Sequence, residues 1–90
     1  MTGKRESIVL THGVFDLMHS NHVEALRVAK SFGDKLIVGV HSDAVAASYK
    51  RWPMLREEER LKQVQAVRYV DEAFIDPKLE TAEMHEERYQ

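Results

Sequence analysis

Short apolar runs and helix-like spacings alternate along this chain, and their order predicts an α/β fold. Residues 7–10 (SIVL), continuing to Thr11, lie between polar residues and Gly13 and predict a buried strand. Residues 35–40 (KLIVGV) are rich in branched apolar side chains, which is typical of a strand covered on both faces in a parallel sheet. Residues 71–75 (DEAFI) predict a third strand that begins after a turn.

The stretches between these strands have helical character. Residues 22–32 predict an amphipathic helix that ends before the Gly33-Asp34 stop signal. Residues 41–49 predict a short helix capped by Ser42 or Asp43, and residues 56–67 predict another amphipathic helix. The charged residues 77–90 are also predicted to be helical. The side chains expected to face the core are Val23, Leu26, Ala29 and Phe32 in the first helix and Leu61, Val64 and Val67 in the later one.

The strand–helix–strand order at this spacing predicts right-handed crossovers and therefore parallel strands. We expect a small parallel sheet flanked by helices. Ninety residues are enough for one domain, so residues 1–90 are expected to form a single unit.

Composition narrows the possible functions. A formal net charge of -2 provides no general attraction to nucleic acid or anionic lipid, so any anion site must be a local group of residues. The absence of cysteine excludes disulfides and thiolate metal sites. The apolar runs are short, and the first residues, MTGKRES, lack the hydrophobic stretch of a signal peptide. We therefore expect a cytoplasmic protein with no nucleic-acid partner and no membrane insertion.

The strongest candidate site lies in residues 11–22 (THGVFDLMHSNH), between the first strand and the first helix. Ligands of open α/β sheets bind beyond the carboxyl ends of the strands, where helix N-termini offer unpaired N–H groups to phosphate. His19 and His22 add donors that titrate near neutral pH and can stabilise charge on a phosphoryl group. Asp16 is expected to orient a loop amide or a histidine, or to help hold a magnesium ion.

Two other interpretations of the histidine pair remain open at this point. His19 and His22 have the spacing of half a zinc site, although no third ligand stands out nearby. Either histidine is alternatively a solvated capping residue. The pair alone does not decide between a functional site and a surface feature.

Several motifs in order resemble the cytidylyltransferase-like nucleotidyltransferases. GVFDLMH followed by SNH resembles their first loop, G-x-F-D-x-x-H-x-G-H. GDKLIVGVHSD (33–43) resembles their second strand and turn, and YKRWPMLREEERLKQVQAVRYVDEAF (49–74) resembles their lysine-bearing loop, E-E-R helix and V-D-E turn. The resemblance covers roughly residues 8–75 and implies a Rossmann-like nucleotidyltransferase fold. The G-V-H-S-D and Y-K-x-x-P-M segments most resemble enzymes that activate phosphoethanolamine, phosphocholine or glycerol phosphate.

The resemblance implies transfer of CMP from CTP to a small phosphorylated alcohol or amine, with release of pyrophosphate and with Mg²⁺ as cofactor. It implies catalytic roles for His19, His22 and Lys50, and it implies no residue that ligates a metal. Substrate-binding roles follow for Asp43 and Arg51. The positions that it assigns to nucleotide binding are Gly13, Val14, Phe15, Asp16, Asn21 and Arg60.

Some of these residues also have simpler structural interpretations. Arg60 is alternatively a partner of Glu57 in an ion pair on the helix surface, and Asp43 is alternatively a cap of the next turn. Lys50 is alternatively a solvated loop lysine. Trp52 is expected to pack at an interface rather than to cover the pocket.

The sequence departs from the family pattern in two places. Asn21 stands where the family has glycine between the histidines, and we expect retuned nucleotide binding rather than a broken fold, because Asn tolerates left-handed conformations. Nothing after Pro77 resembles the later G-D-type and R-T-x-G-I-S-T-type segments of the family. The chain is therefore expected to be a partial domain: a piece of a longer protein, a short relative that needs a partner chain, or a relative that has lost catalysis.

Two alternative functions remain. The first is an adenylyltransferase that acts on a sugar phosphate or FMN, since such enzymes share the first loop. The second is a non-catalytic nucleotide-binding or assembly module. A homodimer is also expected, because the family often pairs subunits near the first helix and the R-Y-V-D-E segment, and because a small domain gains from burying apolar edge surface.

Overall fold

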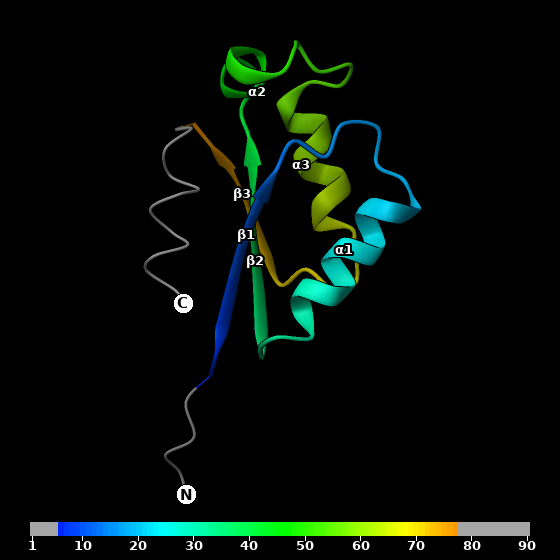
Figure 1. Cartoon of the computed structure of the whole chain (residues 1–90), viewed down its shortest axis with the longest axis vertical. Helices are drawn as coiled ribbons and strands as arrows, with labels where there is room; N and C mark the ends of the chain where they lie inside the picture. The colour runs from blue at the N-terminus through cyan, green and yellow to red at the C-terminus, as the bar shows by residue number, and fades with distance from the viewer. Residues whose placement is uncertain (1–5, 78–90) are drawn as a thin grey trace, which may run out of the picture.

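The computed structural model describes residues 6–77. Strands and helices follow one another in the order β1, α1, β2, α2, α3, β3, as Figure 1 shows. The three strands are β1 (Ile8–Gly13), β2 (Lys35–His41) and β3 (Glu72–Asp76). The three helices are α1 (Ser20–Lys30), α2 (Asp43–Tyr49) and α3 (Glu57–Gln65).

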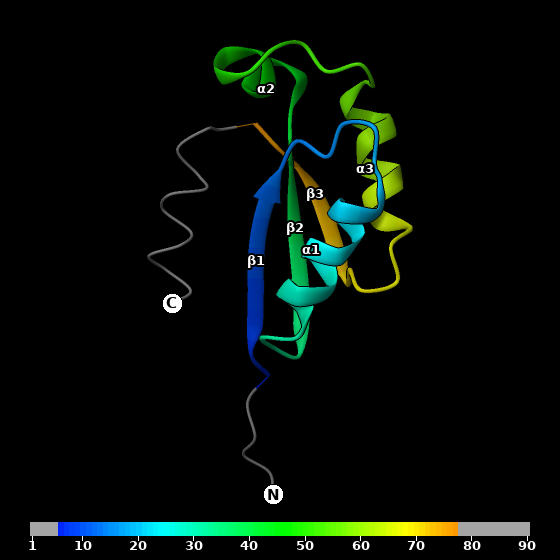
Figure 2. The same ribbon diagram turned by 45° about the vertical axis from the view of Figure 1, so that its right-hand side comes forward.

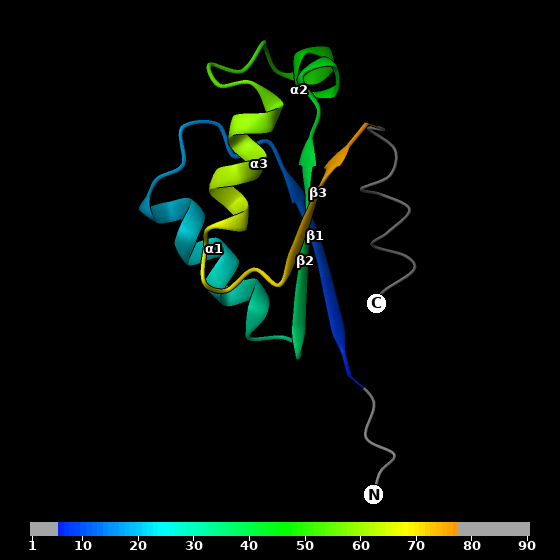
Figure 3. The same ribbon diagram turned by 180° about the vertical axis from the view of Figure 1, so that it is seen from behind.

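The strands form one parallel sheet in the order β1-β2-β3. Helices α1 and α3 lie on the same face of this sheet, and α2 lies beyond the carboxyl end of β2 (Figures 1 and 3). Right-handed crossovers that advance in one direction across a sheet place their helices on one face, which accounts for this arrangement. The predicted α/β class, with a small parallel sheet and Rossmann-like crossovers, is confirmed.

The core lies between the sheet and the two helices on that face. Figure 2 shows α1 and α3 beside the strands. The buried apolar side chains of this core cluster are Leu26 of α1, Leu36, Val38 and Val40 of β2, and Val64 of α3. Val9, Ala29, Leu61 and Val67 pack against this cluster as partly buried neighbours. Alternate positions of β2 thus supply the centre of the core, as expected for the middle strand of a parallel sheet.

One expected core residue is wrong. Phe32 was predicted to continue the apolar face of the first helix, but its side chain is 76% exposed. Helix α1 ends at Lys30, and Ser31 is its C-cap, with its N–H bonded to carbonyls of the last turn. Phe32 therefore lies in the turn that precedes Gly33, where it no longer shares the orientation of Leu26 and Ala29.

The other boundaries differ from prediction by a few residues. β1 continues to Gly13, and α1 begins at Ser20 because a side chain caps it there. Ser42 is the cap of α2, with its Oγ accepting from the N–H of Val45 at 3.1 Å. The helix predicted for residues 77–90 falls, apart from Pro77, outside the described residues. Within residues 6–77, no helix is both long enough and apolar enough to cross a membrane.

Candidate functional site

The loop between β1 and α1 turns sharply. Phe15 and Leu17 have positive φ angles of 56° and 53°, in the left-handed region that side chains seldom adopt. A Cβ atom on Gly13 would lie 2.8 Å from Cε2 of Phe15, so any other residue here would displace the Phe15 ring from its place over the end of β1. Gly13 therefore shapes the loop. Gly13 does not itself line the hollow that this loop borders.

The two histidines form the cap of α1. His19 is the N-cap, and its Nδ1 accepts from the N–H of Asn21 at 3.2 Å. In return, Nδ1 of His22 accepts from the N–H of His19 at 3.2 Å. An imidazole that accepts at Nδ1 carries its proton on Nε2, so both rings keep Nε2–H as a donor. The centroids of the His19 and His22 rings lie 4.1 Å apart, so the two rings present their donors side by side.

The environment of His22 favours its neutral form. Partial burial lowers the pKa of His22 below 6.5, and its electrostatic interactions with the neighbouring His19 ring and with the positive charge of Lys50 lower it further. Phe15 packs edge-on against the His22 ring, with centroids 5.9 Å apart. At neutral pH the ring is therefore a neutral hydrogen-bond donor.

A hollow of about 220 Å³ lies in front of these rings. One wall comes from the first loop and the start of α1. The other comes from the loop after α2, through Lys50, Arg51 and Pro53. The positive charges of Lys50 and Arg51 thus lie opposite the two imidazoles, which suits an anionic group such as a phosphate. We call this hollow the phosphate hollow, after the group that its charges suit, and its lining residues are Val14, Phe15, Asp16, His19, His22, Lys50, Arg51 and Pro53.

Asp16 joins the two walls. Its carboxylate accepts from the N–H of Met54 at 2.7 Å and from the N–H of Leu55 at 2.9 Å. Burial works to raise the pKa of Asp16, but these two donors, together with the charges of Arg60 and Arg51, outweigh it and hold the pKa below 3.8. The sequence-based expectation that Asp16 orients a loop amide is confirmed.

Arg60 lies in a different place from both of its predicted settings. Its side chain is fully buried, so it neither reaches into the hollow nor lies on the helix surface beside Glu57. It donates to the carbonyl oxygens of Val14 (2.9 Å), His41 (2.7 Å) and Leu55 (3.0 Å). Its Nη2 also donates to the Asp43 carboxylate at 2.6 Å. A buried cation with this many partners fixes local backbone structure.

Asp43 and Asn21 also lie outside the lining of the phosphate hollow. The Asp43 carboxylate pairs with Arg60, and the Asp43 N–H donates to Glu57 Oε1 at 2.7 Å. Asn21 contributes its N–H to the His19 ring. Seven of the predicted site residues therefore line one hollow, whereas Gly13, Asn21, Asp43 and Arg60 support its frame. Pro53 lines the hollow without having been predicted; its position three residues after Lys50 was the available signal.

Sequence reasoning also missed a buried polar group at the carboxyl end of the sheet. His12 Nε2 lies 3.2 Å from Asp76 Oδ2, and this contact passes over Gly39, where a Cβ atom would lie 2.6 Å from His12 Cδ2. Nearby, His41 Nδ1 and the Tyr49 hydroxyl are 2.6 Å apart. The first contact links β1 to β3 across β2, and the second links β2 to α2, so the periodicity of a single strand does not reveal them.

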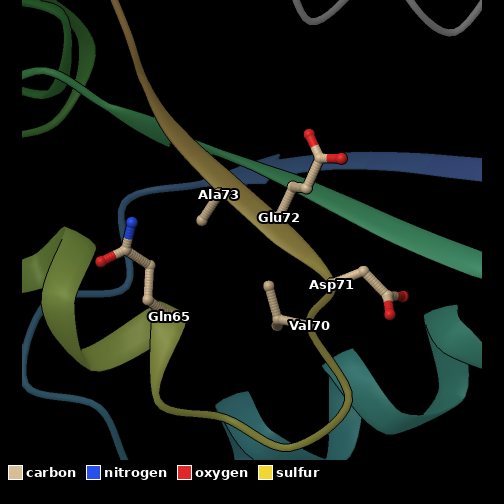
Figure 4. A pocket seen from close by; sticks show the side chains of 5 residues that line it. All are labelled: Gln65, Val70, Asp71, Glu72 and Ala73. Atoms are coloured by element: carbon tan, nitrogen blue, oxygen red, sulfur yellow. The ribbon is translucent and has the colours of Figure 1, made fainter.

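Two further hollows lie elsewhere on the described surface. One, of about 440 Å³, lies beside the start of α3 and is lined in part by Trp52, which is 68% exposed. The expected packing of Trp52 at an interface stays a prediction. Figure 4 shows the other hollow, of about 330 Å³, which lies between α3 and the start of β3. Its lining residues are Gln65, Val70, Asp71, Glu72 and Ala73.

The described part of the chain offers few ligands to a metal ion. No group of three or more histidine, cysteine, aspartate or glutamate side chains in residues 6–77 is arranged to hold a metal ion. Asp16 is the one carboxylate among the described residues that line the phosphate hollow, and both of its oxygens already accept N–H groups. The hollow therefore provides at most one carboxylate to a magnesium ion.

Comparison with known proteins gives two groups of relatives. The chain is 46% identical over 77 residues to a probable ethanolamine-phosphate cytidylyltransferase of Encephalitozoon cuniculi, with 84% of this chain and 24% of that protein covered. It is 43% identical over 77 residues to an FAD synthase of Thermococcus kodakarensis, with 83% of this chain and 52% of that protein covered. The chain thus spans about a quarter of the first relative and about half of the second.

A solved structure has a similar fold. The lipopolysaccharide core biosynthesis protein of Thermoplasma volcanium superposes with a TM-score of 0.83 at 29% sequence identity, covering 92% of this chain and 68% of that one. The family model described as cytidylyltransferase-like matches residues 10–89, which include the whole phosphate hollow. The chain belongs to the cytidylyltransferase-like family.

Proposed function

We propose that this chain carries the phosphate-binding half of a nucleotidyltransferase that transfers CMP from CTP to a small phosphorylated alcohol or amine. Phosphoethanolamine, phosphocholine and glycerol 3-phosphate are the candidate acceptors. The observation that carries the proposal is the convergence of His19, His22 and Lys50 on one hollow at the carboxyl edge of a parallel sheet. The ethanolamine-phosphate cytidylyltransferase relatives support CTP and an amine-bearing acceptor.

The reaction requires positioning and charge stabilisation rather than a covalent enzyme intermediate. A phosphate oxygen of the acceptor attacks the α-phosphorus of CTP, and a new P–O bond forms. The bond from the α-phosphorus to the oxygen that bridges to the β-phosphorus breaks, and its electrons leave with pyrophosphate. The product joins CMP to the acceptor through a new pyrophosphate linkage. Negative charge on the equatorial oxygens and on the leaving group must be neutralised in the transition state.

The residues of the hollow suit these requirements. Nε2–H of His19 and Nε2–H of His22 donate to phosphoryl oxygens, and their positions are fixed in advance by the bonds at Nδ1. Lys50 and Arg51 supply positive charge from the opposite wall. The lowered pKa of His22 leaves its Nδ1 unprotonated at pH 7, so the ring can accept the His19 N–H at Nδ1 and donate from Nε2 at the same time.

Mg²⁺ fits this site as part of the substrate. Magnesium is commonly held by one or two carboxylates together with substrate phosphates and water, and this hollow offers only Asp16 among its described lining residues. We therefore propose that the ion arrives bound to the triphosphate and neutralises charge on the leaving group. The roles of the protein residues are those given above.

Pyrophosphate release tests this function. The full-length protein is incubated with CTP, Mg²⁺ and each candidate acceptor in turn, and we expect release that depends on one acceptor. His19→Asn is the matched inactive variant, because asparagine can still cap the helix through its side-chain oxygen. A folded full-length protein that releases no pyrophosphate with any acceptor would contradict the proposal.

A second candidate is transfer of AMP from ATP to FMN or a sugar phosphate. The observation that favours it is the similarity to FAD synthases, of which the chain covers about half the length. Thermal unfolding in the presence of CTP or ATP separates the two, because the preferred nucleotide raises the melting temperature by mass action. A larger shift with ATP would favour the second candidate.

We also propose that the protein forms a homodimer. Val28, in the last turn of α1, and Phe32, in the turn that follows it, expose apolar surface that a second copy would cover. Sedimentation of the full-length protein at micromolar concentration is the measurement, and a monomer there would contradict the proposal.

A further inference from the structure

The two walls of the phosphate hollow belong to segments far apart in sequence. His19 and His22 follow the first loop, whereas Lys50, Arg51 and Pro53 come from residues 50–56, which form no helix or strand. Lys50 and Arg51 are both exposed, so burial does not fix the second wall. Lys50 itself is the C-cap of α2, with its N–H donating to the Ala46 carbonyl oxygen at 2.9 Å, but the residues after it need another contact to stay opposite the histidines.

The peptide groups around Leu55 supply that contact. The Leu55 N–H donates to Asp16 Oδ1 at 2.9 Å, and the Leu55 carbonyl accepts from Arg60 Nε at 3.0 Å. The neighbouring N–H of Met54 donates to the other oxygen of Asp16 at 2.7 Å. The chain is thus held from both sides where the loop turns toward α3.

Arg60 connects this loop to the rest of the site. Nη1 donates to the carbonyl oxygens of Val14 and His41, and Nη2 pairs with Asp43. One fully buried guanidinium therefore ties together the first loop, the end of β2, the start of α2 and the loop 50–56. Val14 lines the hollow, and Leu55 lies in the loop that carries the second wall. The Arg60 side chain therefore holds the backbone of both segments.

Direct ligand binding accounts poorly for these two residues. Arg60 is fully buried and does not line the hollow. Asp16 does line it, but a carboxylate repels phosphate, and both of its oxygens are bonded to backbone N–H groups.

We infer that Asp16 and Arg60 are positioning residues that clasp residues 50–55 against the first loop and so set the affinity of the hollow for polyphosphate without binding it. The inference rests on the proposed function for its consequence, but the clasp itself is a property of the free protein. The two therefore need separate measurements.

Trp52 reports on the clasp in the absence of ligand. It is the one tryptophan of the sequence and lies between Lys50 and Met54. We expect Asp16→Asn to lower the time-resolved fluorescence anisotropy of Trp52, because an amide nitrogen cannot accept from an N–H group. Asp34→Asn is the matched control, since Asp34 also accepts a backbone N–H, from Ser7, at the opposite end of the sheet. Arg60→Lys tests the hydrogen bonds of the Arg60 guanidinium while keeping a positive charge at this buried position.

Unchanged anisotropy in both Asp16→Asn and Arg60→Lys, with far-ultraviolet circular dichroism like that of the unmodified protein, would overturn the clasp. A variant that loses the circular dichroism signal is replaced by Asp43→Asn, which weakens a single contact of Arg60.

Binding of inorganic tripolyphosphate without magnesium tests the consequence. We expect Asp16→Asn to weaken binding about tenfold, and to add no further loss in a Lys50→Met, Arg51→Met background, because the clasp acts through the wall that carries these two cations. Simple removal of a repelling charge would instead tighten binding, and an independent contribution would be additive; either result overturns the inference. The absence of magnesium removes any role of Asp16 as a metal ligand.

Different results would contradict the proposed function and the inference about the clasp. If the unmodified protein binds neither tripolyphosphate nor CTP, the proposed function fails, whereas the Trp52 anisotropy still decides whether the clasp exists. If the unmodified protein binds both and Asp16→Asn binds equally well, the inference about affinity fails and the proposed function stands.

Discussion

At the scale of single residues, each histidine of the pair has two separate tasks. Nδ1 of His19 and of His22 accepts a backbone N–H and completes the start of α1, and Nε2 stays available for a ligand. The alternatives of capping residue and ligand-binding residue that the sequence left open are therefore compatible. The family glycine is replaced by Asn21, whose N–H is one of the two donors, and a backbone donor does not depend on side-chain type.

Two substitutions of His19 separate these tasks. We expect His19→Asn to retain the unfolding free energy of the unmodified protein, because its side-chain oxygen replaces Nδ1 as the acceptor. We expect His19→Ala to lose about 1 kcal/mol by losing the cap. Both should lower the transfer rate by a factor of about 10² or more, since each lacks the Nε2 donor. Chemical denaturation and pyrophosphate release are the two measurements. Full activity in His19→Asn would show that Nε2 is not needed.

The buried His41 predicts a pH dependence of stability. Burial lowers the pKa of His41 below 6.5, and Arg60 and Lys50 lower it further, against the opposing effect of Asp76. The unfolded chain therefore takes up a proton near pH 6.5, before the folded chain does. The contribution of His41 to the unfolding free energy is complete above that pH and is lost as pH falls from about 6.5 toward the folded pKa.

Denaturation of the unmodified protein and of His41→Asn between pH 7.5 and 5 measures this contribution. We expect the difference in unfolding free energy between the two proteins to shrink as pH falls, because asparagine does not titrate. His22, which also has a lowered pKa, is present in both proteins and cancels in the difference. A difference that is constant with pH would contradict the expectation.

At the scale of elements, local signals accounted for most of the fold. The branched run of β2, the Ser42 cap and the spacing of Leu61 and Val64 were all visible in the sequence and are confirmed. Errors occurred where tertiary contacts decide the outcome. Phe32 lies beyond the end of α1, and Arg60 turned inward because carbonyls of three other segments accept from it. Such long-range hydrogen bonds have no periodicity to detect.

Gly39 of β2 gives a prediction at this scale. Its Cβ would lie 2.6 Å from His12 Cδ2 and 3.1 Å from Phe74 Cζ, so Gly39→Ala must displace a ring from the sheet face. We expect a loss of about 1–3 kcal/mol of unfolding free energy, measured by chemical denaturation. In a His12→Ser background the loss should be smaller, because the closer ring is gone. An equal loss in both backgrounds would show that the His12 contact is not the cause.

At the scale of the whole molecule, parallel topology explains why the site lies where it does. The carboxyl ends of β1 and β2 lie at one edge of the sheet, and the segments that follow them supply the two walls of the hollow. The sequence indicated most of the residues that line the hollow, because the motifs are local. It did not indicate how the walls are joined, since Asp16 meets Met54 and Leu55 across nearly forty residues. The relatives extend well beyond this chain, and base selection is therefore a question for the full-length protein.

The central claim is that His19, His22 and Lys50 face the phosphates of one nucleotide, and calorimetric titration of CTP tests it most directly. The full-length protein is titrated beside Lys50→Met and His22→Asn, with Lys62→Met as a control on the outer part of α3. We expect the first two variants to bind CTP at least tenfold more weakly and the control to bind it as the unmodified protein does. Equal affinity in all four proteins would contradict the claim.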